Sequence, residues 1–218
     1  MNKRLLIAFS LLLIFSTYKP QNLSLVTKFN IKKIIIEDNF ILKDEEIKKS
    51  LIGTYEKNLI FLRTSNIKDI LQEESFIESF EVKKIYPDTI KIKIFEKKPL
   101  AILQNKKKKF YLSQNIELIE YKELNNYDNL PIIFGDKDNF KLIYDNLKKI
   151  EFPFYTIKKL YLFELNRWDL ETHENKIIKL PANNYIQSLK NFMDLRKKKD
   201  FDKYKIYDFR IKNQLILK

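Results

Sequence analysis

The chain has 218 residues and a formal net charge of +13, because 42 lysine and arginine residues outnumber 29 aspartate and glutamate residues. It contains no cysteine, one histidine and two glycines, which excludes disulfides, thiol nucleophiles, cysteine–zinc sites and glycine-rich phosphate loops. The hydrophobic fraction of 44% is enough for a packed core in two small domains.

The positive charge comes mostly from lysines that are spread over every segment. This pattern favours lysines on solvated faces and predicts no nucleic-acid site. A basic surface protein that binds nucleic acid or anionic lipid is the alternative, and its binding would depend steeply on salt.

The N-terminal segment is apolar. Lys3 and Arg4 precede a run of Leu, Ile, Ala and Phe. As a helix, residues 5–18 span about 21 Å, less than the ~30 Å hydrocarbon core. No pair of small residues marks a cleavage site, so we expect an uncleaved single-pass anchor over residues 5–18, with residues 1–4 cytoplasmic and the rest outside. A cleaved signal peptide is the alternative, and residues 19–28 form a polar linker.

Residues 29–98 predict a first α+β domain in the order β-α-α-β-β. Strict alternation after the Pro87-Asp88 turn places Ile90, Ile92 and Ile94 on one face of a half-buried strand. Two amphipathic helices precede this hairpin, and we expect them to cover one face of a three-stranded sheet. The expected strands are 29–36, 76–86 and 89–97, and the helices begin near residues 44 and 64.

Residues 99–218 predict a β-rich domain with two helices, and Pro99 is the expected hinge before it. Apolar runs alternate with polar turns through this half. The expected strands are 101–104, 110–112, 116–119, 157–165, 168–171, 176–180 and 206 to about 217, and the helices are 138–150 and 184–196. Residues 129–135 form an apolar run that ends at a glycine.

Catalytic chemistry has few candidate residues. His173 lies in a predicted polar turn, and the acid pairs Glu45-Glu46 and Glu73-Glu74 lie at helix ends beside lysines. We therefore expect no catalytic residue, cofactor or metal, and no enzymatic activity.

A set of short motifs, in order along nearly the whole chain, resembles the FtsQ/DivIB family of cell-division proteins. A departure is Ser113-Gln114-Asn115, where the family often has glycine. The motifs are Tyr86-Pro87-Asp88-Thr89-Ile90, Glu96-Lys97-Lys98-Pro99-Leu100-Ala101, Leu130-Pro131-Ile132-Ile133-Phe134-Gly135, Arg167-Trp168-Asp169-Leu170 and Tyr207-Asp208-Phe209-Arg210.

The resemblance implies a POTRA domain at 29–98, an FtsQ-type β domain at 99–218, and a non-enzymatic scaffold at the division site of the inner membrane. It implies that the bulk of the chain is periplasmic. It also implies that the β domain binds FtsB and FtsL, and that the POTRA domain contacts other division proteins. Carried over to this chain, the partner-binding residues are Phe209, Arg210, Ile211, Lys212, Asn213, Gln214 and Leu215, with Tyr185, Leu189 and Arg196 on the preceding helix.

Physical reasoning agrees with strand addition at the C-terminus. A terminal strand at a sheet edge exposes unpaired backbone groups to an incoming extended segment. Arg210 would then bond a partner carboxylate, or Asp208 and Arg210 would instead lock the strand in its own domain. A POTRA-bearing component of a transport or secretion system is the alternative function, although it would need several POTRA repeats or a large barrel.

Overall fold

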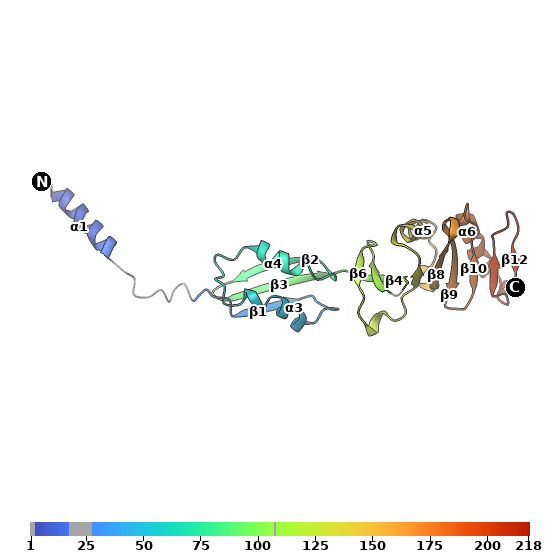
Figure 1. Ribbon diagram of the computed structural model, residues 1–218, viewed down its shortest axis with the longest axis horizontal. Helices are drawn as coiled ribbons and strands as arrows, with labels where there is room; N and C mark the ends of the chain where they lie inside the picture. The colour runs from blue at the N-terminus through green and yellow to red at the C-terminus, as the bar shows by residue number, and fades with distance from the viewer. Residues whose placement is uncertain (1–2, 18–27, 107) are drawn as a thin grey trace. The chain divides into compact units, whose positions relative to one another are not determined.

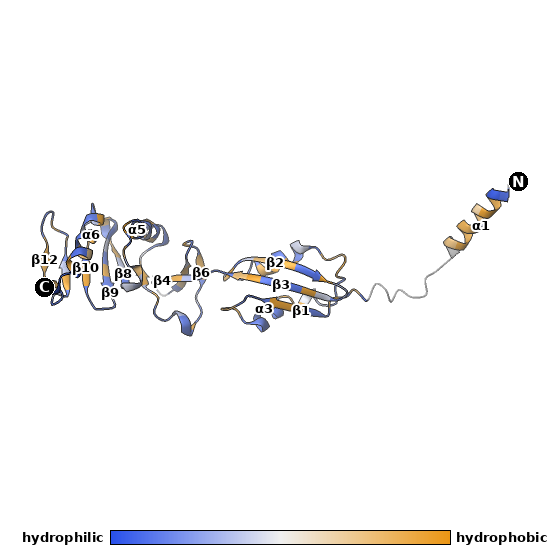
Figure 2. Ribbon diagram, turned by 180° about the vertical axis from the view of Figure 1, so that it is seen from behind, coloured by the Kyte–Doolittle hydropathy of each residue, from blue (hydrophilic) through white to orange (hydrophobic). Residues whose placement is uncertain are grey.

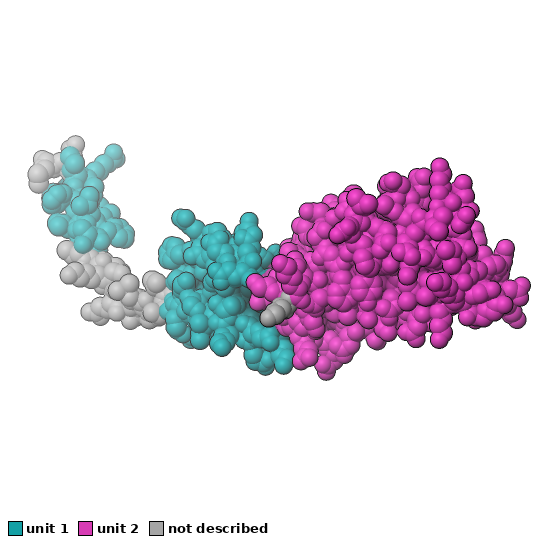
Figure 3. Space-filling model, turned by 45° about the vertical axis from the view of Figure 1, so that its right-hand side comes forward, with its two compact units in different colours: residues 1–74, 79–95 teal, residues 75–78, 96–218 magenta. Residues whose placement is uncertain are grey.

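The computed structural model describes residues 3–17, 28–106 and 108–218. The chain divides into two compact units (Figure 3), each with its own sheet. The first unit contains residues 1–74 and 79–95, and the second contains residues 75–78 and 96–218.

The N-terminal segment forms helix α1 (Lys3–Thr17). Most of it is hydrophobic (Figure 2), and the leucine, isoleucine and phenylalanine side chains from Leu5 to Phe15 are exposed. Within the described residues, none of the helices combines the length and the apolar character needed to cross a membrane. Tyr18 and, apart from Lys28, the expected linker lie outside the described residues.

The first unit has the predicted β-α-α-β-β order (Figure 1). Its three strands are arranged β1-β3-β2, with β1 parallel to β3. The elements are β1 (Lys33–Glu37), α3 (Asp44–Ser50), α4 (Thr64–Leu71), β2 (Ile77–Ile85) and β3 (Thr89–Glu96).

The alternation of β3 builds the core of the first unit. Ile90, Ile92 and Ile94 are fully buried, as the alternation predicted. Each contributes roughly 1.5–3 kcal/mol through burial of its side chain. On the opposite face, Lys93 pairs with Asp38 at 3.0 Å, so charge lies toward solvent and the apolar side faces the helices.

The second unit is built on one nine-stranded mixed sheet, in the order β12-β11-β10-β9-β8-β7-β4-β5-β6. Its predicted β-rich character and its two helices are confirmed. The strands are β4 (Pro99–Asn105), β5 (Lys108–Ser113), β6 (Leu118–Glu120), β7 (Ile132–Phe134), β8 (Ile157–Phe163), β9 (Arg167–Thr172), β10 (Ile177–Lys179), β11 (Ile206–Asp208) and β12 (Ile216–Leu217).

Helices α5 (Lys137–Lys149) and α6 (Tyr185–Arg196) cover the same face of this sheet. The Asp136 carboxylate caps α5 by accepting hydrogen bonds from the Asp138 and Asn139 N–H groups. Phe192 of α6 packs edge-on against Tyr207 of β11, with the ring centroids 4.9 Å apart. The α6 helix is therefore held directly over the C-terminal strands.

The C-terminus differs from the sequence prediction. The expected single strand from 206 to about 217 is wrong, because the chain leaves β11 after Asp208 and returns as the antiparallel β12. β11 is consequently paired on both sides, with β10 and with β12. The free edge belongs to β12, and residues 209–215 are a connection rather than a strand.

Candidate partner-binding site

A groove of about 1180 Å³ lies in the second unit between α6 and the connection that joins β11 to β12. One wall is the whole connecting segment from Phe209 to Leu215, and residues 181–184, which precede α6, also line the groove. The other wall is one face of α6, formed by Ile186, Gln187, Ser188, Asn191, Asp194 and Leu195.

The connecting segment is tied down at its start and exposed in its middle. The Phe209 N–H donates to the Lys179 carbonyl at 2.9 Å, and the Phe209 side chain is buried. Ile211 is 49% exposed, and Asn213 takes a left-handed backbone with φ 59°. The exposed turn therefore presents an apolar side chain beside the groove, while its first residue is held on the sheet.

Arg210 is already engaged within its own unit. Its Nη2 donates to Asp208 Oδ2 at 2.6 Å, and its Nε donates to Asp208 Oδ1 at 2.8 Å. These charge-assisted bonds hold the pKa of Asp208 below its usual value. Of the two roles weighed for this pair, the structure contains the internal lock, so a partner carboxylate would have to share Arg210 with Asp208.

The three helix residues expected at the site do not line the groove. The Tyr185 hydroxyl accepts a hydrogen bond from Asn146 of α5 at 2.6 Å, and Leu189 is fully buried in the core. Arg196 donates to Glu174 at 2.6 Å. The groove brings together the seven residues Phe209 to Leu215, whereas Tyr185, Leu189 and Arg196 support the wall from behind or from its end.

The groove face of α6 was missed in the sequence. Gln187, Asn191 and Asp194 repeat at intervals of four and three residues, which places them on one side of a helix. That spacing was visible, but a polar helix face is normally only solvated. The second wall, which turns this face into a groove, exists because the chain folds back after Asp208.

The edge of β12 offers backbone groups to an incoming strand. Ile206 and Lys218 exchange two hydrogen bonds, at 3.0 and 3.1 Å. In an antiparallel ladder the neighbouring residue points its backbone groups the other way, so the N–H and C=O of Leu217 face away from β11. Within the described part of the chain, the sheet has no strand beyond β12.

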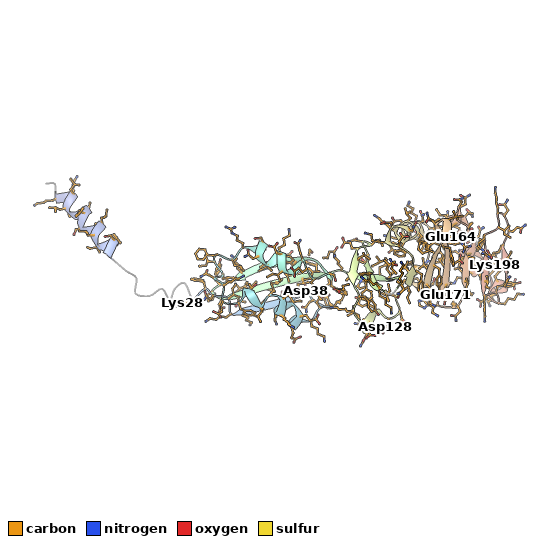
Figure 4. All side chains as sticks on the ribbon, in the orientation of Figure 1. Lys28, Asp38, Asp128, Glu164, Glu171 and Lys198 are labelled. Atoms are coloured by element: carbon orange, nitrogen blue, oxygen red, sulfur yellow. The ribbon has the colours of Figure 1, made fainter. Side chains whose placement is uncertain are left out.

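Charged residues occupy the sheet face opposite the helices. Lys179 lies between Asp169 on β9 and Asp208 on β11 in the strand register. Burial raises the pKa of Asp169 despite nearby cations, and its Oδ1 accepts no hydrogen bond. Glu171, labelled in Figure 4, stands two residues further along β9 and pairs with Lys158 and Lys159 at 3.5 and 3.6 Å.

An ion-pair cluster holds the end of α6 to the β9–β10 turn. Glu174 pairs with Arg196 at 2.6 Å and with Lys176 at 3.6 Å, and Lys176 also pairs with Asp202. The Lys176 side chain is buried. In the part of the chain that the structure describes, no three histidine or acidic residues are grouped so that they could hold a metal ion.

Comparison with known proteins identifies the first unit. The sequence model of the family described as POTRA domain, FtsQ-type, matches residues 29–97. A solved structure of the extracytoplasmic domain of DivIB from Geobacillus stearothermophilus aligns with 45% of this chain and 89% of its own, at 14% identity. The TM-score of this alignment is 0.33.

Relatives extend the similarity through the second unit. The cell division protein FtsQ of Rickettsia conorii is 28% identical over 205 residues, covering 91% of this chain and 76% of that protein. FtsQ of Rickettsia bellii is 29% identical over 191 residues, covering 85% and 71%. DivIB of Clostridium tetani is 30% identical over 108 residues, covering 50% and 40%. Together with the FtsQ-type domain match, these similarities relate the chain to the FtsQ and DivIB cell-division proteins over most of its length.

Proposed function

We propose that this protein is a non-enzymatic scaffold of the division machinery, which binds FtsB- and FtsL-type partners at the C-terminal end of its β domain. Similarity to FtsQ and DivIB cell-division proteins supports a role in division. The observation that carries the binding proposal is the open edge of β12 beside the groove walled by α6 and residues 209–215.

Strand addition at β12 supplies affinity through backbone hydrogen bonds. The free edge is short, since β12 has two residues and only Leu217 turns its N–H and C=O outward. A partner held by so few ladder bonds needs further contact, and the adjoining groove provides it. The exposed Ile211 and the amide side chains of Gln187 and Asn191 are the groups it meets there.

The proposal places the protein in the inner membrane at the division site, with α1 as its anchor and its two units in the periplasm. Support comes from the hydrophobic character of α1 and from the two basic residues at its start. Local thinning of the bilayer would accommodate a short span. The POTRA domain is proposed to contact other division proteins.

The binding proposal is tested by Leu217→Pro, with Leu217→Ala as the matched control. Both substitutions remove the leucine side chain, but only proline removes the outward N–H donor. We expect Leu217→Pro to weaken binding of a purified FtsB-type partner from the same organism about fivefold to tenfold, since one hydrogen bond contributes about 1 kcal/mol. Leu217→Ala should cost no more than about twofold.

The measurement is a titration of the full chain with labelled partner, followed by fluorescence anisotropy. Circular dichroism checks that both variants keep the fold of the wild type. Equal affinities of the proline and alanine variants would show that the edge of β12 does not bind the partner through its backbone.

A further inference from the structure

The first unit has a longer open strand edge than the second. The two sheets end in β1 with five residues, β2 with nine, β12 with two and β6 with three. Seven residues of β2, from Ser79 to Ile85, belong to the first unit. All seven are exposed or only partly buried, so the edge strand itself is accessible along this length.

The backbone of this edge is available for pairing. β2 is the last strand of its sheet, so every second residue turns its N–H and C=O away from β3. Among the described residues, no turn or loop forms a backbone hydrogen bond with residues 79–85. An incoming antiparallel strand would therefore find an unoccupied ladder.

The side chains of β2 have a charge pattern that complements itself. Glu81 and Lys83 are both exposed and lie on the same face of the strand, on either side of Val82. Lys84 lies on the other face, where its ammonium donates to the Leu62 carbonyl at 2.7 Å. Glu81 and Lys83 are thus the charged side chains that a strand laid along this edge meets on the exposed face.

Symmetry restricts how two β2 strands can pair. Two identical antiparallel edges are related by a twofold axis perpendicular to the sheet, and residues opposite each other share a face. The axis must therefore lie midway between the two copies of one residue, which then face each other across the strand pair. With the axis at Val82, each Glu81 faces a Lys83 of the other copy. An axis at Glu81 or at Lys83 would instead oppose like charges, which is unfavourable.

We propose that residues Ser79–Ile85 bind the same segment of a second copy of this chain, with the twofold axis at Val82. The two three-stranded sheets become one continuous sheet, and two symmetric Glu81–Lys83 pairs set its register. Charged side chains on an edge strand also serve to prevent pairing. If Glu81 and Lys83 have this protective role, the experiment below will detect no specific dimer.

Disulfide trapping is a clean test because the chain has no cysteine of its own. In the proposed register Val82 faces Val82, with Cα atoms about 4.5–5.5 Å apart, within the range of a disulfide. Ser79→Cys is the matched control on the same edge, since the two copies of residue 79 would lie about 20 Å apart. We expect Val82→Cys to form at least about five times more crosslinked dimer.

The measurement is mild oxidation of the full chain, purified in mild detergent because α1 is hydrophobic, followed by a non-reducing gel. Equal crosslinking of Val82→Cys and Ser79→Cys would mean random collisions and would overturn the proposal.

Charge reversal then tests the register. In the Val82→Cys background, Glu81→Lys places lysine opposite lysine at two symmetric positions, and we expect about tenfold less crosslinked dimer. Lys83→Glu should have the same effect. The double variant Glu81→Lys with Lys83→Glu restores opposite charges and should restore crosslinking to within about twofold of the parent. If the double variant is no better than either single one, the register is refuted.

Discussion

At the scale of single residues, two aspartates on the same sheet face have pKa values shifted in opposite directions. Asp208 accepts hydrogen bonds from Arg210, which lower its pKa, whereas burial raises the pKa of Asp169. Both lie next to Lys179 in the strand register. The difference is that the Asp208 carboxylate accepts hydrogen bonds from Arg210, whereas the buried Oδ1 of Asp169 has no hydrogen-bond partner and lies 3.9 Å from the Arg167 Nε.

The same substitution should therefore change stability in opposite directions. Asp208→Asn is expected to lower the free energy of unfolding at about pH 7 by about 1–2 kcal/mol, because a charge-assisted bond is lost. Asp169→Asn is expected to be neutral or to raise it by up to about 1 kcal/mol, because an ionised buried group no longer has to be desolvated. Urea denaturation of the full chain measures both.

The pH dependence has a definite sign for each variant. A lowered folded-state pKa stabilises above the unfolded pKa of about 3.9, so the deficit of Asp208→Asn should shrink as pH falls below that value. A raised pKa penalises the charged form, so the gain of Asp169→Asn should disappear over the pH range in which Asp169 takes up a proton. Parallel profiles for the two variants would contradict this account. Asp194→Asn, at an exposed pair with Lys197, is the control and should change little.

At the scale of elements, α6 has three functional sides. Leu189 and Phe192 face the core, Arg196 is tied to Glu174, and Gln187 and Asn191 face the groove and share a side-chain hydrogen bond of 2.9 Å. The apolar side followed from the helical period. The groove side did not, because the wall it faces comes from residues 209–215.

Asn191→Trp should separate these sides of α6. A bulky ring in the groove is expected to weaken binding of the FtsB-type partner at least about tenfold, because it occupies space that the partner needs. Arg196→Ala is the control; it removes a surface ion pair and should cost less than about 1 kcal/mol of stability while leaving affinity within about twofold. Calorimetric titration of the two variants decides. If Arg196→Ala weakens binding and Asn191→Trp does not, Arg196 is the partner-binding residue, as the sequence predicts.

At the scale of the whole molecule, the chain joins a hydrophobic helix to two units that each have their own core. Each sheet buries its apolar face under two helices and leaves a charged face open. The net charge of +13 is spread over such faces, and many lysines pair locally with acids, as Lys91 does with Glu37 at 2.7 Å. This distribution fits a solvated surface better than a single basic patch.

The proposed topology is a property of the whole chain and has its own test. An alkaline phosphatase that is active only outside the cytoplasm, fused after Lys218, should be active and should stay with the membrane after alkaline extraction. Exchanging Lys3 and Arg4 for Glu should lower that activity severalfold, because basic residues keep the N-terminal side in the cytoplasm. An active fusion that alkaline extraction releases from the membrane would argue for a cleaved or peripheral form.

The amino-acid sequence by itself determined the elements with strong local periodicity. The alternation through Ile90, Ile92 and Ile94 predicted β3, and the apolar stripe through Phe140, Ile143 and Leu147 predicted α5. In both, the signal lies in neighbouring residues and needs no distant contact.

Only the tertiary structure decided the end of the chain and the site built on it. Residues 206–217 have a strand-like composition, yet Arg210 turns back to Asp208 and the backbone reverses to form β12. Such a reversal is stabilised by contacts with β10 and α6, which are remote in sequence. The groove exists because α6 and residues 209–215 meet, and the edges of β12 and β2 are open because no further strand pairs with them in the described part of the chain. Local periodicity in the sequence predicts neither.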